Sequence, residues 1–331
     1  MAAAPTASFG LTIPQRGALI GIAGLPELLQ LGPRAEATGV IDSVWVGDSL
    51  TAKPRPESLT MLGALAGMTE RVRLGVGCMA SFPLRDPATF AYQWATLDQI
   101  SAGRMVLAAC TGIVPAKGAS RAEGRNFGGV ADVDRPRRMV ENMELCRRLW
   151  RGEQLDPETS FGRYEGLGIE PRPVQDPCPI WIAANPAPGT YWERSLRRVA
   201  RLADGFQTCV LAPGVLGAMR NDLVGFLAEE GRSADDFPMM AYHNVNIGPD
   251  ADACLAESKR FLDAYYGPVF TEPMVEAWTA AGTPEQCVAH LADLIDQGAT
   301  EITLRCTSFD QEGQFRRLTE EVLPALTSSA S

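Results

Sequence analysis

The sequence predicts a (β/α)8 TIM barrel that spans residues 1–331 as a single domain. Short apolar, β-branched runs alternate with helical patterns of roughly 10 to 15 residues, which is typical of βαβ units and a parallel sheet. Eight such units follow one another along the chain. A chain of 331 residues, 46% of them hydrophobic, is long enough to close one barrel around one large core.

The strands are predicted from short runs of Val, Ile, Leu and aromatic residues that end in small residues. In a barrel of this kind the chemistry takes place on the loops at the carboxyl ends of the strands. The predicted strands are, in order, Phe9–Ile13, Ser43–Gly47, Arg73–Met79, Met105–Ala109, Ile180–Ala184, Gly205–Val210, Met239–Ile247 and Glu301–Cys306.

The helices are predicted from apolar residues that recur at helical spacing between the strands. They are Leu25–Ala37, Glu57–Met68, Ala88–Ile100, Arg135–Trp150, Trp192–Leu202, Val215–Glu229, Ala251–Ala264 together with Pro284–Asp296, and Gln311–Leu323.

Three connections, residues 113–134, 152–176 and 265–282, are longer than a barrel requires. Long irregular segments in compact domains usually act as lids or binding loops. The first and third follow the carboxyl ends of strands, so we expect them over the mouth of the barrel. The second leads into a strand, which places it at the opposite end.

Composition excludes several classes of protein. The net charge of −10 and a pI near 4.9 argue against a nucleic-acid-binding surface. No run approaches the ~18 apolar residues of a membrane span, and no segment resembles a secretory signal. The eight cysteines are scattered, without paired spacing for zinc or a disulfide framework. We expect a cytoplasmic protein with reduced thiols and no metal.

Several short motifs, in this order and spacing, resemble those of the luciferase-like oxidoreductases. This family covers bacterial luciferase, flavin-dependent monooxygenases and enzymes that use the deazaflavin coenzyme F420. The resemblance extends over nearly the whole chain and implies a (β/α)8 barrel and a homodimer. The motifs are Trp45–Asp48, Arg71–Gly75, Pro83–Pro87, Leu97–Arg104, Pro171–Val174, Pro179–Ala183, Leu202–Gly205, Gly282–Glu285 and Glu321–Leu326.

The resemblance implies a cofactor site on the third and fourth strands. In the family a non-proline cis peptide, matching Gly77–Cys78 with Met79 beside it, supports the flavin or deazaflavin ring. Close packing inside the barrel would also explain a glycine in a strand. Cys110 and Thr111 match positions beside the cofactor, and Thr111 stands where luciferase has an arginine near the flavin phosphate.

The segment after the fifth predicted strand is the best candidate for an anion site. It leads directly into a helix, and the N-terminus of a helix offers free N–H groups and a partial positive charge. A simple turn with a helix cap is the alternative. The candidate residues are Ala184, Asn185, Gly189 and Thr190.

Asp48, Ser49 and His243 are the candidate catalytic residues. Many relatives have histidine at the position of Ser49, and deazaflavin-dependent sugar dehydrogenases have an acid where this chain has Ile113. Both departures argue against a sugar-phosphate dehydrogenase, because a serine hydroxyl cannot act as an acid or base near neutral pH. Asp48 could instead accept helix N–H groups, and His243 could be an ordinary core residue.

The predicted substrate pocket is apolar, which suits a hydrophobic or aromatic substrate and the exclusion of water. Its predicted lining residues are Phe82, Ile113, Tyr265 and Trp278, with Met79, Val114 and Tyr266 nearby. Arg85 could bind a phosphate or carboxylate, or pair with Asp86.

Together these features favour an enzyme that uses reduced FMN and dioxygen to oxygenate a small hydrophobic or aromatic substrate. A separate flavin reductase would then be needed, because the chain has no nicotinamide-binding fingerprint. Hydride transfer with coenzyme F420 is the alternative, and a flavin-binding protein without catalysis is a second. A metal-dependent hydrolase is disfavoured, because the chain has only two histidines.

Overall fold

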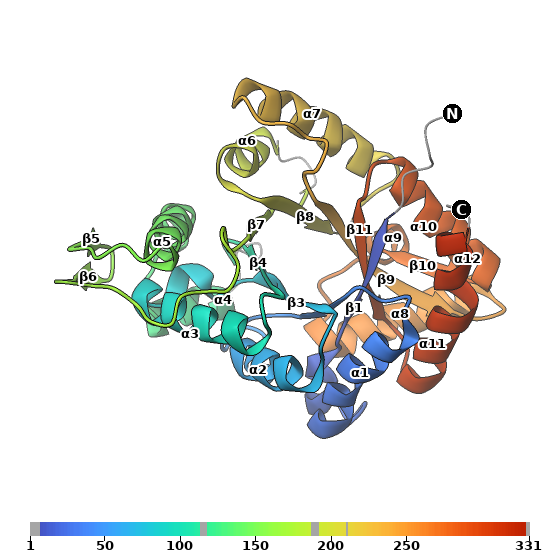
Figure 1. The fold of residues 1–331 in the computed structure, drawn as a ribbon. Coiled ribbons are helices and arrows are strands. Elements are labelled where there is room, and N and C mark those ends of the chain that lie inside the picture. Colours follow the sequence, from blue (N-terminus) through green and yellow to red (C-terminus); the bar gives the residue numbers. More distant parts are fainter. Residues whose placement is uncertain (1–6, 113–117, 187–191, 210, 329–331) are drawn as a thin grey trace.

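The computed structural model describes residues 7–112, 118–186, 192–209 and 211–328. Parallel strands form a closed barrel in the order β1, β2, β3, β4, β7, β8, β9 and β11, with helices between and around them (Figure 1). The predicted (β/α)8 barrel is confirmed. Its strands are β1 (Ser8–Thr12), β2 (Ser43–Val46), β3 (Arg73–Met79), β4 (Met105–Ala109), β7 (Ile180–Ala183), β8 (Gly205–Cys209), β9 (Met239–Ile247) and β11 (Glu301–Cys306).

The predicted helices are also present, with bounds that shift by a few residues at most, apart from the last. That helix is interrupted by a π-helical turn at Leu318–Val322 before it ends. The helices are α1 (Leu25–Thr38), α2 (Ser58–Met68), α3 (Pro87–Ile100), α5 (Arg135–Trp150), α6 (Glu193–Leu202), α7 (Val215–Glu229), α8 (Ala251–Tyr266), α10 (Pro284–Asp296), α11 (Gln311–Arg317) and α12 (Leu323–Ser328).

The long connections contain structure that the sequence patterns did not predict. The first holds helix α4 (Gly118–Asn126), and the second holds a small hairpin, β5 (Glu158–Thr159) and β6 (Gly162–Arg163). The third holds α9 (Glu272–Ala277) and β10 (Thr279–Gly282), which pairs in parallel with the end of β9. These pieces are short and rich in small or polar residues, so they have no clear periodicity.

Side chains along the strands alternate between the barrel interior and the layer beneath the helices. Trp45 and Trp181 fill the interior with ring centroids 5.7 Å apart, in one cluster with Val106, Ala108 and Met240. Gly75 is needed beside them, because a Cβ there would lie 2.2 Å from the Trp45 ring. The interior is therefore filled by tryptophan at this level, and the open end lies above it.

All eight barrel strands point the same way, so the loops after them gather at one end, the mouth of the barrel. Among the described residues, no helix is long and apolar enough to cross a membrane. The same part of the chain contains no cluster of three or more residues suited to a metal ion.

Candidate active site

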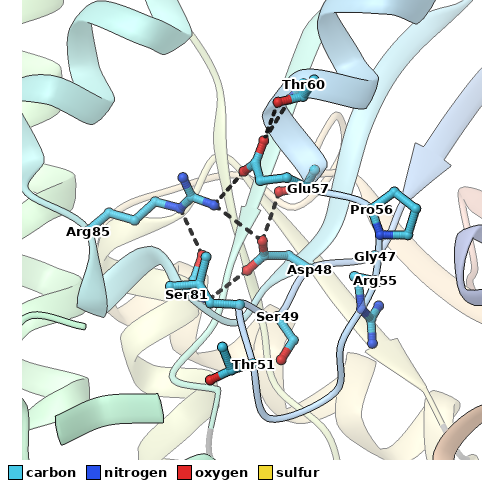
Figure 2. Close-up of polar contacts among 12 residues, drawn as sticks. Gly47, Asp48, Ser49, Thr51, Arg55, Pro56, Glu57, Thr60, Ser81 and Arg85 are labelled. Carbon is cyan, nitrogen blue, oxygen red and sulfur yellow. Dashed lines mark hydrogen bonds and ion pairs between the residues drawn. The ribbon is translucent and has the colours of Figure 1, made fainter. Parts of the chain in front are cut away.

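Asp48 follows β2 and holds three parts of the mouth together (Figure 2). Its Oδ1 accepts a hydrogen bond from the Ser58 hydroxyl at 2.8 Å, at the start of α2. Its Oδ2 accepts the Ser81 N–H at 2.7 Å, in the turn after β3. The side chain is 2% exposed. Both carboxylate oxygens therefore have partners, which favours a positioning role for Asp48 over that of a free base.

Arg85 completes this network. Its guanidinium donates to Glu57 Oε1 at 2.7 Å and to the Ser81 hydroxyl at 2.8 Å, and lies 3.6 Å from Asp48 Oδ1 (Figure 2). Asp86 instead accepts the Thr89 N–H and caps α3. The predicted pairing of Arg85 with Asp86 is therefore wrong, and two other carboxylates of the same chain already neutralise this arginine.

Ser49 is fixed by a buried glutamate that sequence reasoning missed. The Ser49 hydroxyl donates to Glu123 Oε1 at 2.9 Å and accepts the Lys53 N–H at 3.0 Å. The same Glu123 oxygen accepts the N–H groups of Leu50, Thr51 and Ala52 at 2.7, 2.7 and 3.0 Å. Glu123 belongs to α4 and is 1% exposed. Glu123 therefore connects the predicted insertion 113–134 to the loop after β2. A contact between residues 74 positions apart has no local sequence signal, so it could not be predicted.

His243 does not face the mouth, which argues against its predicted catalytic role. On β9 its neighbours Tyr242 and Asn244 face the interior, where both contact Arg305. His243 points the other way and packs against His290 of α10, with ring centroids 4.8 Å apart. Burial, together with the charge of His290, lowers the pKa of His243 well below its usual value. Alternation along the strand therefore assigns this histidine to the outer core.

The expected cis peptide between Gly77 and Cys78 is present. A Cβ at Gly77 would lie 2.6 Å from Gln207 Nε2 and 3.1 Å from the Trp45 ring. Close packing thus explains this glycine in part, and its contact with a cofactor stays a prediction. Cys78 lies beside Cys110, with their sulfur atoms 2.7 Å apart. The contact lowers the pKa of the Cys78 thiol and raises that of Cys110, which burial raises further.

Phe82, predicted in the substrate pocket, and Met79, predicted beside the cofactor, both lie in the outer core. Phe82 is fully buried and packs edge to face on Phe90 of α3, with centroids 5.1 Å apart. Met79 is also fully buried in this core cluster. Phe82 therefore does not line a pocket at the mouth, because the turn after β3 directs it toward the helices.

The residues after β7 hold neighbouring strands together. The Asn185 side-chain oxygen accepts the Cys209 N–H at 3.0 Å, and the Ala184 N–H donates to the Gln207 carbonyl at 3.0 Å. Thr111 is half-buried at the end of β4, where its carbonyl accepts a bond from Arg135 at 3.4 Å. The other predicted residues of these loops, Gly189, Thr190, Ile113 and Val114, lie outside the described residues.

The predicted aromatic residues of the third connection do come together, around a buried arginine. Arg305, at the end of β11, has no exposed surface. Its guanidinium carbon lies 4.9 to 5.4 Å from the ring centroids of Tyr242, Tyr265, Tyr266 and Trp278. It donates twice to Asn244 Oδ1, at 2.8 and 3.2 Å, and once to the Tyr266 hydroxyl, at 2.6 Å. The predicted apolar pocket wall is therefore an aromatic cage around a cation.

Tyr266 is a residue of this cage whose pKa is lower than that of an ordinary tyrosine. Burial alone would raise its pKa, but the positive charges of Arg305, Arg55 and Lys53 together lower it below the usual tyrosine value. The Lys53 ammonium lies 4.9 Å from the centre of the Tyr266 ring. A phenol in this setting loses its proton more readily than an ordinary tyrosine.

Comparison with known families decides the relationship of this chain. Residues 7–301 match the model of the luciferase-like monooxygenase family. The chain belongs to this family. Its members in general are oxidoreductases, and we describe the chain from here on as a luciferase-like oxidoreductase.

Curated relatives of this luciferase-like oxidoreductase include F420-dependent glucose-6-phosphate dehydrogenases. That of Nakamurella multipartita is 26% identical over 92% of this chain and 93% of its own length. That of Intrasporangium calvum is 27% identical, over 92% and 95%. Solved structures with the same fold include an F420-dependent secondary alcohol dehydrogenase in complex with an F420-acetone adduct (TM-score 0.78, 16% identity, 97% and 99% of the two chains). Monooxygenase RslO1 from Streptomyces bottropensis is equally similar (TM-score 0.77, 22% identity, 96% and 99%).

The mouth of this luciferase-like oxidoreductase combines small side chains with a buried amide that has no partner among the described residues. The side chains at the ends of β3 and β4 are small, namely Ala80, Cys110 and Gly112. Gln207 lies against Gly77, is 2% exposed, and has neither amide atom hydrogen-bonded within the described residues. A buried amide without partners needs an explanation. The pyrimidine edge of a flavin or deazaflavin, with its carbonyl and N–H groups, is a matching partner.

Proposed function

We propose that this luciferase-like oxidoreductase uses coenzyme F420 to transfer hydride to or from a small organic substrate. The observation that carries the proposal is the identity of about a quarter, over more than 90% of each chain, to relatives named as F420-dependent dehydrogenases. This reverses the preference for reduced FMN that the sequence alone supports. The bound deazaflavin supplies or accepts the hydride.

The residues of the chain would bind the cofactor, position the loops and transfer the proton. The unpaired Gln207 amide would bind the pyrimidine edge of the ring, and the Gly77–Cys78 peptide would lie against its face. Asp48 and Ser49 would position the loop after β2, because both have their polar atoms engaged. Tyr266 Oη is the candidate proton donor or acceptor, since Arg305 holds it at the mouth.

The substrate would differ from a sugar phosphate. Ser49 replaces the histidine of many relatives, and its hydroxyl donates to Glu123 rather than into the mouth. A proton relay through this position is therefore unavailable. We infer that proton transfer takes another route, through the Tyr266 hydroxyl.

A binding experiment tests the choice of cofactor. Oxidised F420 and FMN are titrated separately into the protein and followed by fluorescence; then the reduced cofactors are added anaerobically and oxygen is admitted. We expect F420 to bind more tightly than FMN, with no oxygen-dependent intermediate. Tighter binding of reduced FMN and a peroxide-like spectrum on adding oxygen would instead support the monooxygenase, with dioxygen and a flavin reductase as partners.

A variant tests the role of Gln207. Gln207→Leu removes the amide at similar volume and should weaken F420 binding by at least about tenfold, the loss of one good hydrogen bond. Gln99→Leu is the matched control, because that amide donates to the Arg172 carbonyl on the outside of the barrel. If the wild-type protein bound neither F420 nor FMN, the proposal of a redox enzyme would be contradicted.

A further inference from the structure

Four cations gather at one side of the mouth, and we call them the mouth cation cluster: Arg16, Lys53, Arg55 and Arg305. Arg16 lies in a short 3-10 helix, Gln15–Leu19, in the connection after β1. Lys53 and Arg55 lie in the loop after β2, and Arg305 lies near the end of β11. Because β11, β1 and β2 are neighbours in the barrel, the three loops meet. The cluster therefore lies away from β4 and β7, where the cofactor loops are predicted.

Contacts between the members and two tyrosines define the site. Lys53 lies over the Tyr266 ring at 4.9 Å, and Arg16 over the Tyr265 ring at 5.7 Å. The two tyrosine rings are 4.8 Å apart. Arg55 joins the cluster by donating from Nε to the Lys53 carbonyl at 3.2 Å, and it lies apart from the Asp48–Arg85 network in Figure 2.

Among the described residues, no carboxylate pairs with the mouth cation cluster. Within the described residues none of the four cations forms an ion pair, although Arg34, Arg73, Arg85 and other arginines do. The chain has 40 acidic and 30 basic residues, so acidic partners are not scarce. Like charges this close repel one another and persist only when other interactions compensate.

Unpaired donors beside the cluster point to the same conclusion. Arg16 Nε and Asn244 Nδ2 are buried and have no hydrogen-bond partner among the described residues. Asn244 itself has no exposed surface and holds Arg305 through its other amide atom. The side chains of Arg16, Lys53, Arg55 and Tyr266 are partly exposed, so a ligand can reach them, whereas Arg305 lies beneath and fixes Tyr266.

We propose that Arg16, Lys53 and Arg55, beside the Tyr266 ring, bind an anionic oxygen group, a carboxylate or a phosphate, carried by the substrate. An anion there would neutralise the cluster and accept charge-assisted hydrogen bonds. Lys53 follows β2 and Cys78 lies on the neighbouring strand β3, so the bound substrate would face the predicted ring position. The assignment to the substrate rests on the proposed function, whereas the anion site itself does not.

The electrostatics of Lys53 agree with this geometry. Burial lowers its pKa, and the charges of Arg55 and Arg16 lower it further, while Tyr266 acts in the opposite direction. A bound anion would offset these repulsions and favour the charged ammonium.

The test uses the full chain without cofactor, with inorganic phosphate and benzoate as probes and calorimetry as the measurement. The wild-type protein should bind at least one probe saturably. Lys53→Met combined with Arg55→Met should weaken that binding by about tenfold or more. Lys53→Arg alone keeps the positive charge and should bind the probe like the wild-type protein. Arg34→Met is the matched control, because Arg34 pairs with Glu312 on the outer helices and should leave binding unchanged.

Two outcomes would overturn the proposal. Equal binding of both probes to wild type and the double variant would show that the cluster is not the site. Loss of F420 affinity in the double variant, with no binding of either probe to wild type, would assign the cations to the phosphodiester of the coenzyme. Lys53→Met alone repeats the test if the double variant fails to fold. Because the probes are titrated without coenzyme, a failure of F420 to bind would not affect this result.

Discussion

The sulfur atoms of Cys78 and Cys110 lie 2.7 Å apart, where β3 and β4 end at the mouth of the barrel. The two residues are 32 positions apart in sequence and meet only because their strands are neighbours. Both are free thiols, and the contact lowers the pKa of the Cys78 thiol. A thiol with a lowered pKa beside a second thiol is the arrangement from which a disulfide forms under oxidants.

We therefore expect diamide to oxidise this pair to a disulfide. Thiol titration of the denatured protein should fall from eight groups to six, two fewer, and dithiothreitol should restore all eight. Cys110→Ser should lose this diamide-sensitive pair and keep its remaining seven thiols. Unchanged thiol counts in the wild-type protein would show that the pair does not form a disulfide.

Glu123→Ala should destabilise the protein by about 3 kcal/mol or more. The substitution leaves the Ser49 hydroxyl and three backbone N–H groups without their shared acceptor, and buried unsatisfied donors are costly. Urea denaturation measures the loss. Glu312→Ala, which removes an exposed partner of Arg34, should cost less than about 1 kcal/mol. Similar small losses for both variants would contradict the clamp role of Glu123.

Tyr266 should ionise below the usual tyrosine pKa, because Arg305, Arg55 and Lys53 outweigh the opposing effect of burial. In an ultraviolet titration the wild-type protein should show an early tyrosinate signal that Tyr266→Phe lacks. Tyr92→Phe, at an exposed position, should keep it.

The same shift predicts how stability depends on pH. An acid whose pKa is lower in the folded state stabilises that state fully above about pH 10, the unfolded value, and the benefit disappears as pH falls through the folded pKa. The stability difference between wild type and Tyr266→Phe should therefore grow as pH rises through this window. A difference independent of pH would contradict the lowered pKa.

His243→Leu should make the protein less sensitive to acid. The pKa of His243 is lowered by burial and by His290, so the unfolded chain binds a proton more readily than the folded one. Wild-type stability should therefore fall as pH drops below about 6.5, with a slope of up to roughly 1.4 kcal/mol per pH unit for one histidine. Denaturation between pH 5 and about 8 measures the slope. Cofactor binding by His243→Leu should match that of the wild-type protein. A loss of binding would show that His243 contributes to the candidate site.

The regular elements could be predicted because each has a local signal. The strand Arg73–Met79 and the helix Val215–Glu229 were identified with the bounds that the structure has, since burial sets their periodicity. Strand β10, Thr279–Gly282, carries no such signal. Its four small residues become a strand only because β9 offers an edge to pair with.

The candidate site was predictable in part. The position of the cis peptide at Gly77–Cys78 and the gathering of Tyr265 with Trp278 followed from motifs and from loops at the carboxyl ends of strands. The residues that contact these site residues could not be predicted from the sequence. Glu123 reaches Ser49, and Arg305 reaches four aromatic rings, only after the barrel has closed.

The sequence by itself determined the barrel, its order of strands and helices, and the family to which the chain belongs, because periodicity and motifs are local properties. Only the tertiary structure decided which polar groups are already satisfied and which are free. It places His243 in the outer core through the alternation of β9 and gives Asp48 and Ser49 hydrogen-bond partners. Among the described residues it leaves Lys53 and Arg55 without a carboxylate partner. Pairing of charges and hydrogen bonds depends on distances between remote residues, and those distances exist only in the closed barrel.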